Sequence, residues 1–464
     1  MNRRHRISPC RPFLAKSMTK AAQSRLISQH RLSAQYSKTI RAGLLPYSQA
    51  RMAPFLGVAL LVASVAHASP DQLGAFAYVT ALFAIVSAPL SLPLSAAGNV
   101  VADQRRQGLD SASVFPAGFT FALLLAGVLV VLSVLMYANL HQFSGYRTLG
   151  GDTVVKLSLM LMPALPLLVI NTYLHVYHEA AGQARFCSWL RSSCVLGGLV
   201  YLGVAASLVP ADRFVFYAMA YPVLIEVIQL VGYVWLSYQK NLSFKLARIG
   251  SVGKTILQLG LPLSIGLCGQ RIYGALLNER LAGLNAQLVA DLAVYMSVLG
   301  ILTVPVAAFS QLHSVYVSRS NASRRDLYQL GMPWIAALAA VLTLLLLLGG
   351  PGLFYLFGGD TTPFTSRIFL TLALSVASMC ALGLITAQLR ALKDALRPQL
   401  IVLSVTFLGV LPAIYLVDLT HADLDTVLRI DTLLRVPALL YLHRRAVRLS
   451  RQPVDLAHEV RLGA

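Results

Sequence analysis

The chain has 464 residues, of which 57% are apolar and 12% are charged, and its mean hydropathy is +0.68. Soluble globular proteins carry about 25% charged residues, so this composition excludes a soluble protein with a water-covered surface. The net charge of +20 would favour nucleic-acid binding in a soluble chain. Here the bases lie in loops and tails between apolar runs, which is typical of an α-helical membrane protein, and no nucleic-acid partner is expected.

Residues 1–41 form a basic segment at the start of the chain. They are rich in Lys, Arg, Ser and Gln, and no Asp or Glu occurs before Asp71. This composition fits an organelle transit peptide, a disordered tail at an anionic membrane leaflet, or a chain that starts at Met18. We predict a disordered cytoplasmic tail over 1–41 that takes no part in the fold.

Apolar runs of the length that crosses a hydrocarbon core of ~30 Å then follow one another to the end of the chain. The last run is the weakest, because Arg429, Asp431 and Arg435 interrupt it. The sequence predicts twelve membrane-spanning helices, at residues 43–66, 72–95, 115–138, 157–179, 187–209, 214–237, 257–281, 286–312, 332–349, 366–389, 399–418 and 424–443.

Lys and Arg gather in alternate connections between these helices. The basic connections share a side with both termini and lie around residues 105, 185, 245, 324, 393 and 445. Cytoplasmic loops carry such an excess of bases, so we expect both termini in the cytoplasm and the chain in a plasma membrane, the inner membrane of a bacterium.

A weak internal repeat divides the chain. A shift of about 216 residues brings Pro46 onto Pro262, Ala77 onto Ala293, and Pro89 onto Pro305. A repeat of six spans keeps both copies in the same orientation, related by an axis along the membrane normal. The sequence therefore predicts an all-α membrane protein with two six-helix lobes, at 42–245 and 246–445, and a cytoplasmic tail at 446–464.

These features resemble the multidrug/oligosaccharidyl-lipid/polysaccharide exporter superfamily over roughly residues 43–443. A Leu-Pro pair lies in the first helix of each predicted lobe, and a Pro closes the second helix of each. A pair of arginines follows that second helix in both lobes, at Arg105 and Arg106 and at Arg324 and Arg325. The resemblance implies two lobes around a central cavity, and secondary transport by alternating access.

Three branches of that superfamily remain open as expectations. The multidrug and toxic-compound extrusion (MATE) branch places a carboxylate where this chain has Gln270, and it implies a cation-coupled multidrug efflux antiporter. The polysaccharide-flippase branch implies a lipid-linked glycan substrate. The stretch Gln270-Arg271-Ile272 is similar to the progressive-ankylosis-type branch, which implies export of small polyanions. We favour export of an anionic small metabolite or lipid-linked substrate.

Ionisable residues inside a membrane are costly and normally face protein or water. Arg51 and Arg271 lie about one helical turn apart after the repeat is superposed, so we predict that both bind the anionic part of the substrate, unless they reach the headgroups instead. Gln270, Asn171 and Arg429 complete the predicted substrate site. Arg429 precedes Asp431 and Arg435, and the alternative is an ion pair within that helix.

Two further polar groups are candidates for ion coupling. Asn171, His175 and His178 follow one another at helical spacing, and Glu226 lies in the middle of the sixth span. A histidine can titrate near neutral pH, so His175 and Glu226 are predicted to couple transport to an ion gradient. Hydrogen bonds between helices, and a pair between Glu226 and Arg191, are the structural alternatives.

Motifs for enzymatic chemistry are absent from the sequence. It contains no Walker A loop, no HExxH and no nucleophile elbow. Its five cysteines show no metal-binding spacing. No cofactor and no enzymatic activity are expected, and the expected partners are membrane lipids and the transported substrate.

Overall fold

The computed structural model describes residues 12–451 except for positions 109, 321, 360–361 and 418–423. The side chains of residues 12–30 and of several later helical residues, including Arg51, also lie outside the described part. Every regular element among the described residues is a helix, so the predicted all-α class is confirmed.

The helices of the first half are α1 (Pro12–Ala68), α2 (Leu73–Ser91), α3 (Ala97–Arg106), α4 (Phe115–Ala138), α5 (Ser144–Thr148), α6 (Gly151–Leu161), α7 (Ala164–His178), α8 (Ala184–Leu208) and α9 (Ala211–Gln239). Short 3₁₀ or π turns join several of them, at η1 (Pro70–Gln72), η2 (Leu92–Ala96), η3 (Ser111–Val114), η4 (Leu140–Gln142) and η5 (Glu179–Gln183).

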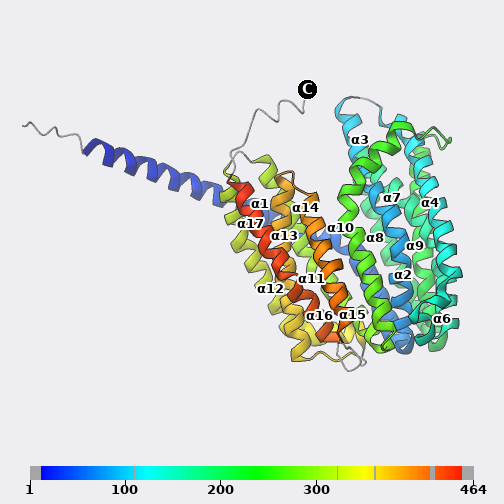
Figure 1. Cartoon of the computed structure of the whole chain (residues 1–464). Coiled ribbons are helices and arrows are strands. Elements are labelled where there is room, and N and C mark those ends of the chain that lie inside the picture. The colour runs from blue at the N-terminus through cyan, green and yellow to red at the C-terminus, as the bar shows by residue number, and fades with distance from the viewer. Residues whose placement is uncertain (1–11, 109, 321, 360–361, 418–423, 452–464) are drawn as a thin grey trace, which may run out of the picture.

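The helices of the second half are α10 (Gly250–Ala282), α11 (Ala286–Arg319), α12 (Arg324–Gly358), α13 (Ser366–Ala391), α14 (Leu396–Val405), α15 (Leu411–Leu416), α16 (Leu424–Leu434) and α17 (Val436–Ser450), with the π turn η6 (Thr406–Val410) between α14 and α15. Figure 1 shows α2–α9 gathered on one side of the molecule and α11–α17 on the other, with α10 between them.

Eight helical stretches in the described residues are long and apolar enough to cross a membrane, and bent α10 makes a ninth. One of the eight, Gly151–Leu208, folds back at η5 and supplies two crossings. The remaining two predicted spans are the second part of α1, only partly described, and the pair α16 and α17, which divides beside Arg435. The elements thus follow the order of the twelve predicted spans.

Large apolar side chains cover the outward faces of these helices. Leu344, Leu345, Leu347 and Leu348 of α12 are all exposed, as are several valines of α4. Because contiguous apolar surface of this extent is not stable in water, these faces are the ones that contact lipid. The buried apolar side chains form one cluster that runs through both halves.

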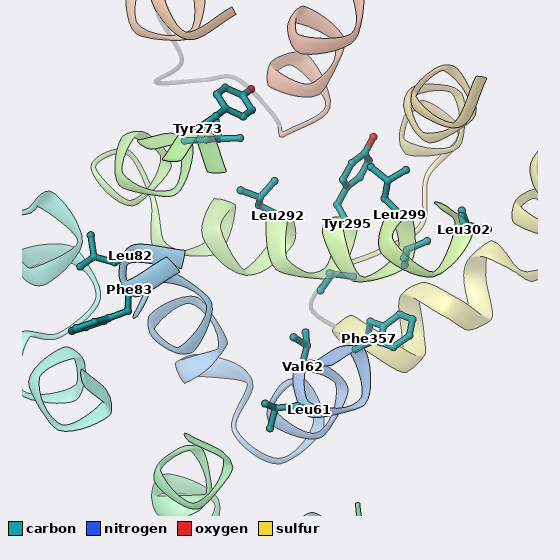
Figure 2. Packing of buried hydrophobic residues seen from close by; sticks show 14 of the residues in the cluster. Leu61, Val62, Leu82, Phe83, Tyr273, Leu292, Tyr295, Leu299, Leu302 and Phe357 are labelled. Atoms are coloured by element: carbon teal, nitrogen blue, oxygen red, sulfur yellow. The ribbon is translucent and has the colours of Figure 1, made fainter. Parts of the chain in front are cut away.

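The core between the halves is built by helices that pack on the opposite half. α1 packs mainly on α11, and α10 packs mainly on α2 and η2. Figure 2 shows Leu61 and Val62 of α1 on one side of α11, which contributes Leu292, Tyr295 and Leu299 to the buried cluster. α10 also passes close to η2, where a Cβ on Gly260 would lie 2.2 Å from the carbonyl oxygen of Pro93.

The basic connections lie at one end of the bundle. Figure 1 shows the end of α3 and the C-terminal end of α17 at this end, and α6, α15 and α16 at the other. We call the first the basic end, because it carries residues such as Arg105, Lys254, Arg325 and Arg448. At the basic end, Gly182 has a positive φ of 94° and turns the chain between α7 and α8, and Arg105 donates to the carbonyl oxygen of Ala180 at 3.0 Å.

The start of the chain differs from the predicted disordered tail. α1 already begins at Pro12, and its first part extends beyond the bundle (Figure 1). Tyr36 and Ile40 are fully buried, and the Tyr36 hydroxyl lies 2.8 Å from His313 Nδ1 of α11. The expectation fails over this stretch because Tyr36 and Ile40 lie one helical turn apart and form a small apolar face. Residues 1–11 lie outside the described part.

Candidate functional site

A polar seam joins α7 and α9 inside the first lobe. Asn171 Nδ2 donates to the Glu226 carboxylate at 2.6 Å and to the Glu226 main-chain oxygen at 2.7 Å. Asn171 is buried. The structure therefore brings together one residue predicted to bind substrate and one predicted to couple an ion.

The two histidines of α7 extend this seam along the same helix face. His175 Nδ1 lies 2.8 Å from the Tyr233 hydroxyl, and its Nε2 lies 3.6 Å from the Glu179 carboxylate. His178 Nε2 lies 2.8 Å from Ser237 Oγ. All the predicted polar residues of α7 thus face α9, where each has a partner.

Sequence reasoning missed the partners of the histidines. Tyr233 and Ser237 follow Glu226 at intervals of seven and four residues, which places all three on one face of α9. That spacing was visible in the sequence. The Arg191 side chain of α8, named there as a possible partner of Glu226, interacts electrostatically with both Glu226 and Tyr233.

The seam retains unused hydrogen-bonding capacity. Asn171 Oδ1 and His178 Nδ1 are buried, and neither has a partner among the described residues. Buried polar atoms without partners are uncommon and costly. Asn171 Oδ1 is therefore an unused acceptor next to the residue that carries the Glu226 carboxylate.

Arg429 has a different environment in the second lobe. Its guanidinium forms an ion pair with Asp425 at 2.8 Å, and its Nε donates to Thr371 Oγ1 at 3.2 Å. Asp425 in turn accepts a hydrogen bond from Thr371. The charge of Arg429 is therefore neutralised within its own lobe.

A second ion pair lies where α16 ends and α17 begins. Arg435 contacts Asp431 at 2.7 Å, and the Tyr273 hydroxyl of α10 donates to the same carboxylate at 3.0 Å. Both pairs have i,i+4 spacing. The sequence offered the pair between Asp431 and Arg435 as an alternative, but not the pair between Asp425 and Arg429. A small cavity of about 40 Å³ adjoins Arg435, and its walls include Ser378 and Met379 of α13.

Gln270 and Arg271 lie in the middle of α10 and are exposed. Neither side chain has a hydrogen bond or ion pair with another described residue. Gly266 and Gly269 face Gln399 and Leu403 of α14. At 100° per residue, Arg271 lies on roughly the opposite side of α10, away from α14. Its predicted counterpart, Arg51, has a side chain outside the described residues.

A larger apolar groove of about 570 Å³ opens at the basic end between α4 and α10. Its walls are Phe121, Ile249, Gly253, Lys254, Leu257, Gln258 and Leu261. None of the predicted site residues lines this groove. Among the described residues, no group of three or more His, Cys, Asp or Glu side chains has the arrangement to hold a metal ion.

Comparison with known proteins gives similarity in structure alone. No protein-family model matches the chain, and no curated protein matches it in sequence. An inward-facing MATE transporter of the MOP superfamily aligns with a TM-score of 0.66 at 16% identity, over 86% of this chain and 95% of that chain. The outward-facing conformation of a MATE transporter gives a TM-score of 0.60 at 16% identity, over 90% and 97%.

A third similar structure is a MOP superfamily transporter from Pyrococcus furiosus, described as having a binding pocket of reverse polarity that suggests a different function. It aligns with a TM-score of 0.60 at 14% identity, over 90% of this chain and 97% of that chain. These alignments cover nearly the whole bundle, including both lobes. The chain therefore has the fold of the MATE transporters of the MOP superfamily, as its sequence pattern indicated.

Proposed function

We propose that this chain is a secondary transporter that exports an anionic small metabolite or an anionic lipid-linked substrate by alternating access. The support is a two-lobe fold shared with transporters solved in inward-facing and outward-facing conformations. In such a fold the two lobes rock about a site between them. Both termini would lie in the cytoplasm, in the plasma membrane of a bacterium.

The exposed side chain of Arg271 is the observation that supports an anionic substrate. It is exposed in the middle of a spanning helix and has no ion-pair partner among the described residues. Placing a free arginine at the centre of a membrane helix costs about 2.5–3.5 kcal/mol on insertion scales, so such side chains face water or an anion. The neighbouring Gln270 supplies hydrogen bonds without an opposing negative charge.

The Pyrococcus furiosus structure supports the idea that the charge of the binding pocket varies within this fold, because that pocket is described as having reverse polarity. In the present chain the acid of the MATE branch is replaced by Gln270 and followed by Arg271. Arg51 would complete the anion site from the equivalent helix of the first lobe. Arg429 is a weaker candidate, since Asp425 already neutralises it.

Glu226 is our candidate for the coupling residue. Its carboxylate contacts Asn171, and His175 lies on the same seam. A proton bound to Glu226 would change the hydrogen bonds between α7 and α9, and His175 would relay it. This seam is also the observation that favours the alternative function, a cation-coupled multidrug efflux antiporter. A lipid-linked polysaccharide flippase is a third candidate, favoured by the same cationic residue, Arg271.

Proteoliposomes test the proposal with citrate as a small polyanion and ethidium as a cationic drug. We expect uptake of citrate, and a 30–150-fold loss of citrate affinity in Arg271→Ala, because about 2–3 kcal/mol is lost with a desolvated charge-assisted pair. Arg271→Lys keeps the charge but not the two-pronged geometry, so its loss should be smaller. Transport of ethidium alone, unchanged in Arg271→Ala, would favour the multidrug antiporter.

A further inference from the structure

The last turn of α10, at the end of the bundle opposite the basic end, contacts the first lobe through Glu279. Glu279 Oε2 accepts a hydrogen bond from the Tyr78 hydroxyl of α2 at 2.5 Å. Its other oxygen, Oε1, accepts from the main-chain nitrogen of Ser144, the first residue of α5, at 2.5 Å. Both oxygens of one carboxylate in the second lobe are therefore bonded to donors of the first.

The next residue connects α10 to its own lobe. The Arg280 guanidinium lies 5.4 Å from the ring centre of Tyr415 in α15. Its Nε atom is buried and has no hydrogen-bond partner among the described residues. Consecutive side chains of α10 thus point to the two lobes, Glu279 to the first and Arg280 to the second.

The surrounding contacts are tight at this end. Tyr78 is 1% exposed, and a Cβ on Gly145 would lie 2.4 Å from its ring. A Cβ on Gly74 of α2 would lie 2.9 Å from the carbonyl oxygen of Ala286, at the start of α11. His67 Nε2, at the end of α1, lies 3.0 Å from the carbonyl oxygen of Leu356 in α12. The two lobes are therefore in contact at this end.

A carboxylate suits a reversible bridge between the lobes. An ionised carboxylate only accepts hydrogen bonds, and its bonds to N–H and O–H donors are about twice as strong as neutral ones. Both bonds to Glu279 must break for the lobes to separate at this end. Water can replace both donors once the end is open, so the bridge does not block opening.

We propose that Glu279, Tyr78 and the main chain of Ser144 form a gate latch that stabilises the conformation in which the end opposite the basic end is closed. This inference rests on the proposed alternating-access function. The latch sets the ratio of open to closed conformations at that end, and so the fraction of molecules in which the substrate site is accessible from that side. It makes no contact with Gln270 or Arg271, and substrate affinity is not its role.

Spin labels at Gln142 and Arg367 test the latch in the full chain in nanodiscs, in a background with the native cysteines replaced. Both positions are exposed at the latch end, in the first and second lobe respectively. Double electron–electron resonance then reports the distance across the gate. We expect Glu279→Gln and Tyr78→Phe each to raise the ratio of open to closed conformations by about tenfold, as the loss of one charge-assisted bond implies.

Ser144→Ala is the matched control, because the main-chain donor at this position remains. We expect it to leave the distance distribution unchanged. The latch would be wrong if Glu279→Gln and Tyr78→Phe left the open fraction unchanged while the addition of citrate changed it. Alternating access would then still hold. A single, fixed distance in every variant, with and without citrate, would overturn both the latch and the proposed alternating access.

Discussion

The docking of α1 on the second lobe through Tyr36 makes a sharp prediction about stability. Tyr36 is fully buried, and its ring meets Tyr316 edge-on with centroids 5.2 Å apart. Its hydroxyl is one end of a buried chain of hydrogen bonds. His313 Nδ1 is the first partner at 2.8 Å, and His313 Nε2 lies 2.9 Å from Gln388 Oε1.

The direction of these bonds fixes what a substitution removes. Gln388 Nε2 donates to Ser450 Oγ at 2.8 Å and to the Arg324 main-chain oxygen at 3.1 Å, so Gln388 Oε1 is an acceptor. His313 must then carry its proton on Nε2, and its Nδ1 accepts from Tyr36. Tyr36→Phe leaves that nitrogen buried without a donor, which costs about 1–3 kcal/mol.

Tyr36→Ala removes the ring as well, and deletion of a buried aromatic side chain costs about 3–5 kcal/mol. Thermal unfolding of the purified protein in detergent, followed by intrinsic fluorescence, measures both variants. Because one kcal/mol shifts the Tm of a 150–250-residue domain by only about 2–4 °C, we expect a small decrease for Tyr36→Phe and a clearly larger one for Tyr36→Ala.

Lys38→Ala is the matched control, since Lys38 is two residues away and exposed. The Tm of this variant should equal that of the wild-type protein. If all three variants unfolded together, the α1 extension would not be docked on α11, and the disordered tail expected from composition would be the better description.

The remaining predictions concern topology, coupling and packing. Reporter fusions at residues 250, 322 and 455 should lie in the cytoplasm and those at 70, 212 and 360 outside, and an external signal at 250 would contradict parallel repeats. Glu226→Gln should abolish gradient-driven citrate uptake while substrate binding persists, and normal uptake by this variant under a proton gradient would exclude Glu226 as the coupling residue. Gly260→Ala should destabilise the protein by about 1–3 kcal/mol or more in a denaturation assay, because its Cβ would overlap the Pro93 main chain; Gly274→Ala, whose Cβ would have no neighbour within 4 Å, is the control.

Much of the fold followed from patterns that are local along the chain. Apolar length, the alternation of bases between connections and the prolines in register are each visible within one repeat, and membranes allow few alternatives to spanning helices. The same locality explains why the i,i+4 pair between Arg435 and Asp431 was among the alternatives at the outset. Helix periodicity alone placed Asn171, His175 and His178 on one face.

Partners across the fold could not be predicted in this way. Glu279 bonds to Tyr78 201 positions away, and Tyr36 bonds to His313 277 positions away. Such pairs depend on how α1 and α10 cross to the opposite half, which no spacing within either helix encodes. Tyr36 also lies in a segment whose basic composition predicted disorder. The burial of Tyr36 and Ile40 is enough to order this part of the segment.

The sequence by itself determined an all-α membrane protein with two similar lobes, because hydrophobic length and charge asymmetry are set by the residues of each segment. Only the tertiary structure decided which intramembrane charges are satisfied. It paired Arg429 with Asp425 and Glu226 with Asn171, and it left Arg271 exposed. The physical reason is that the energy of a charge in a membrane depends on its neighbours in space, which the packing of the helices supplies.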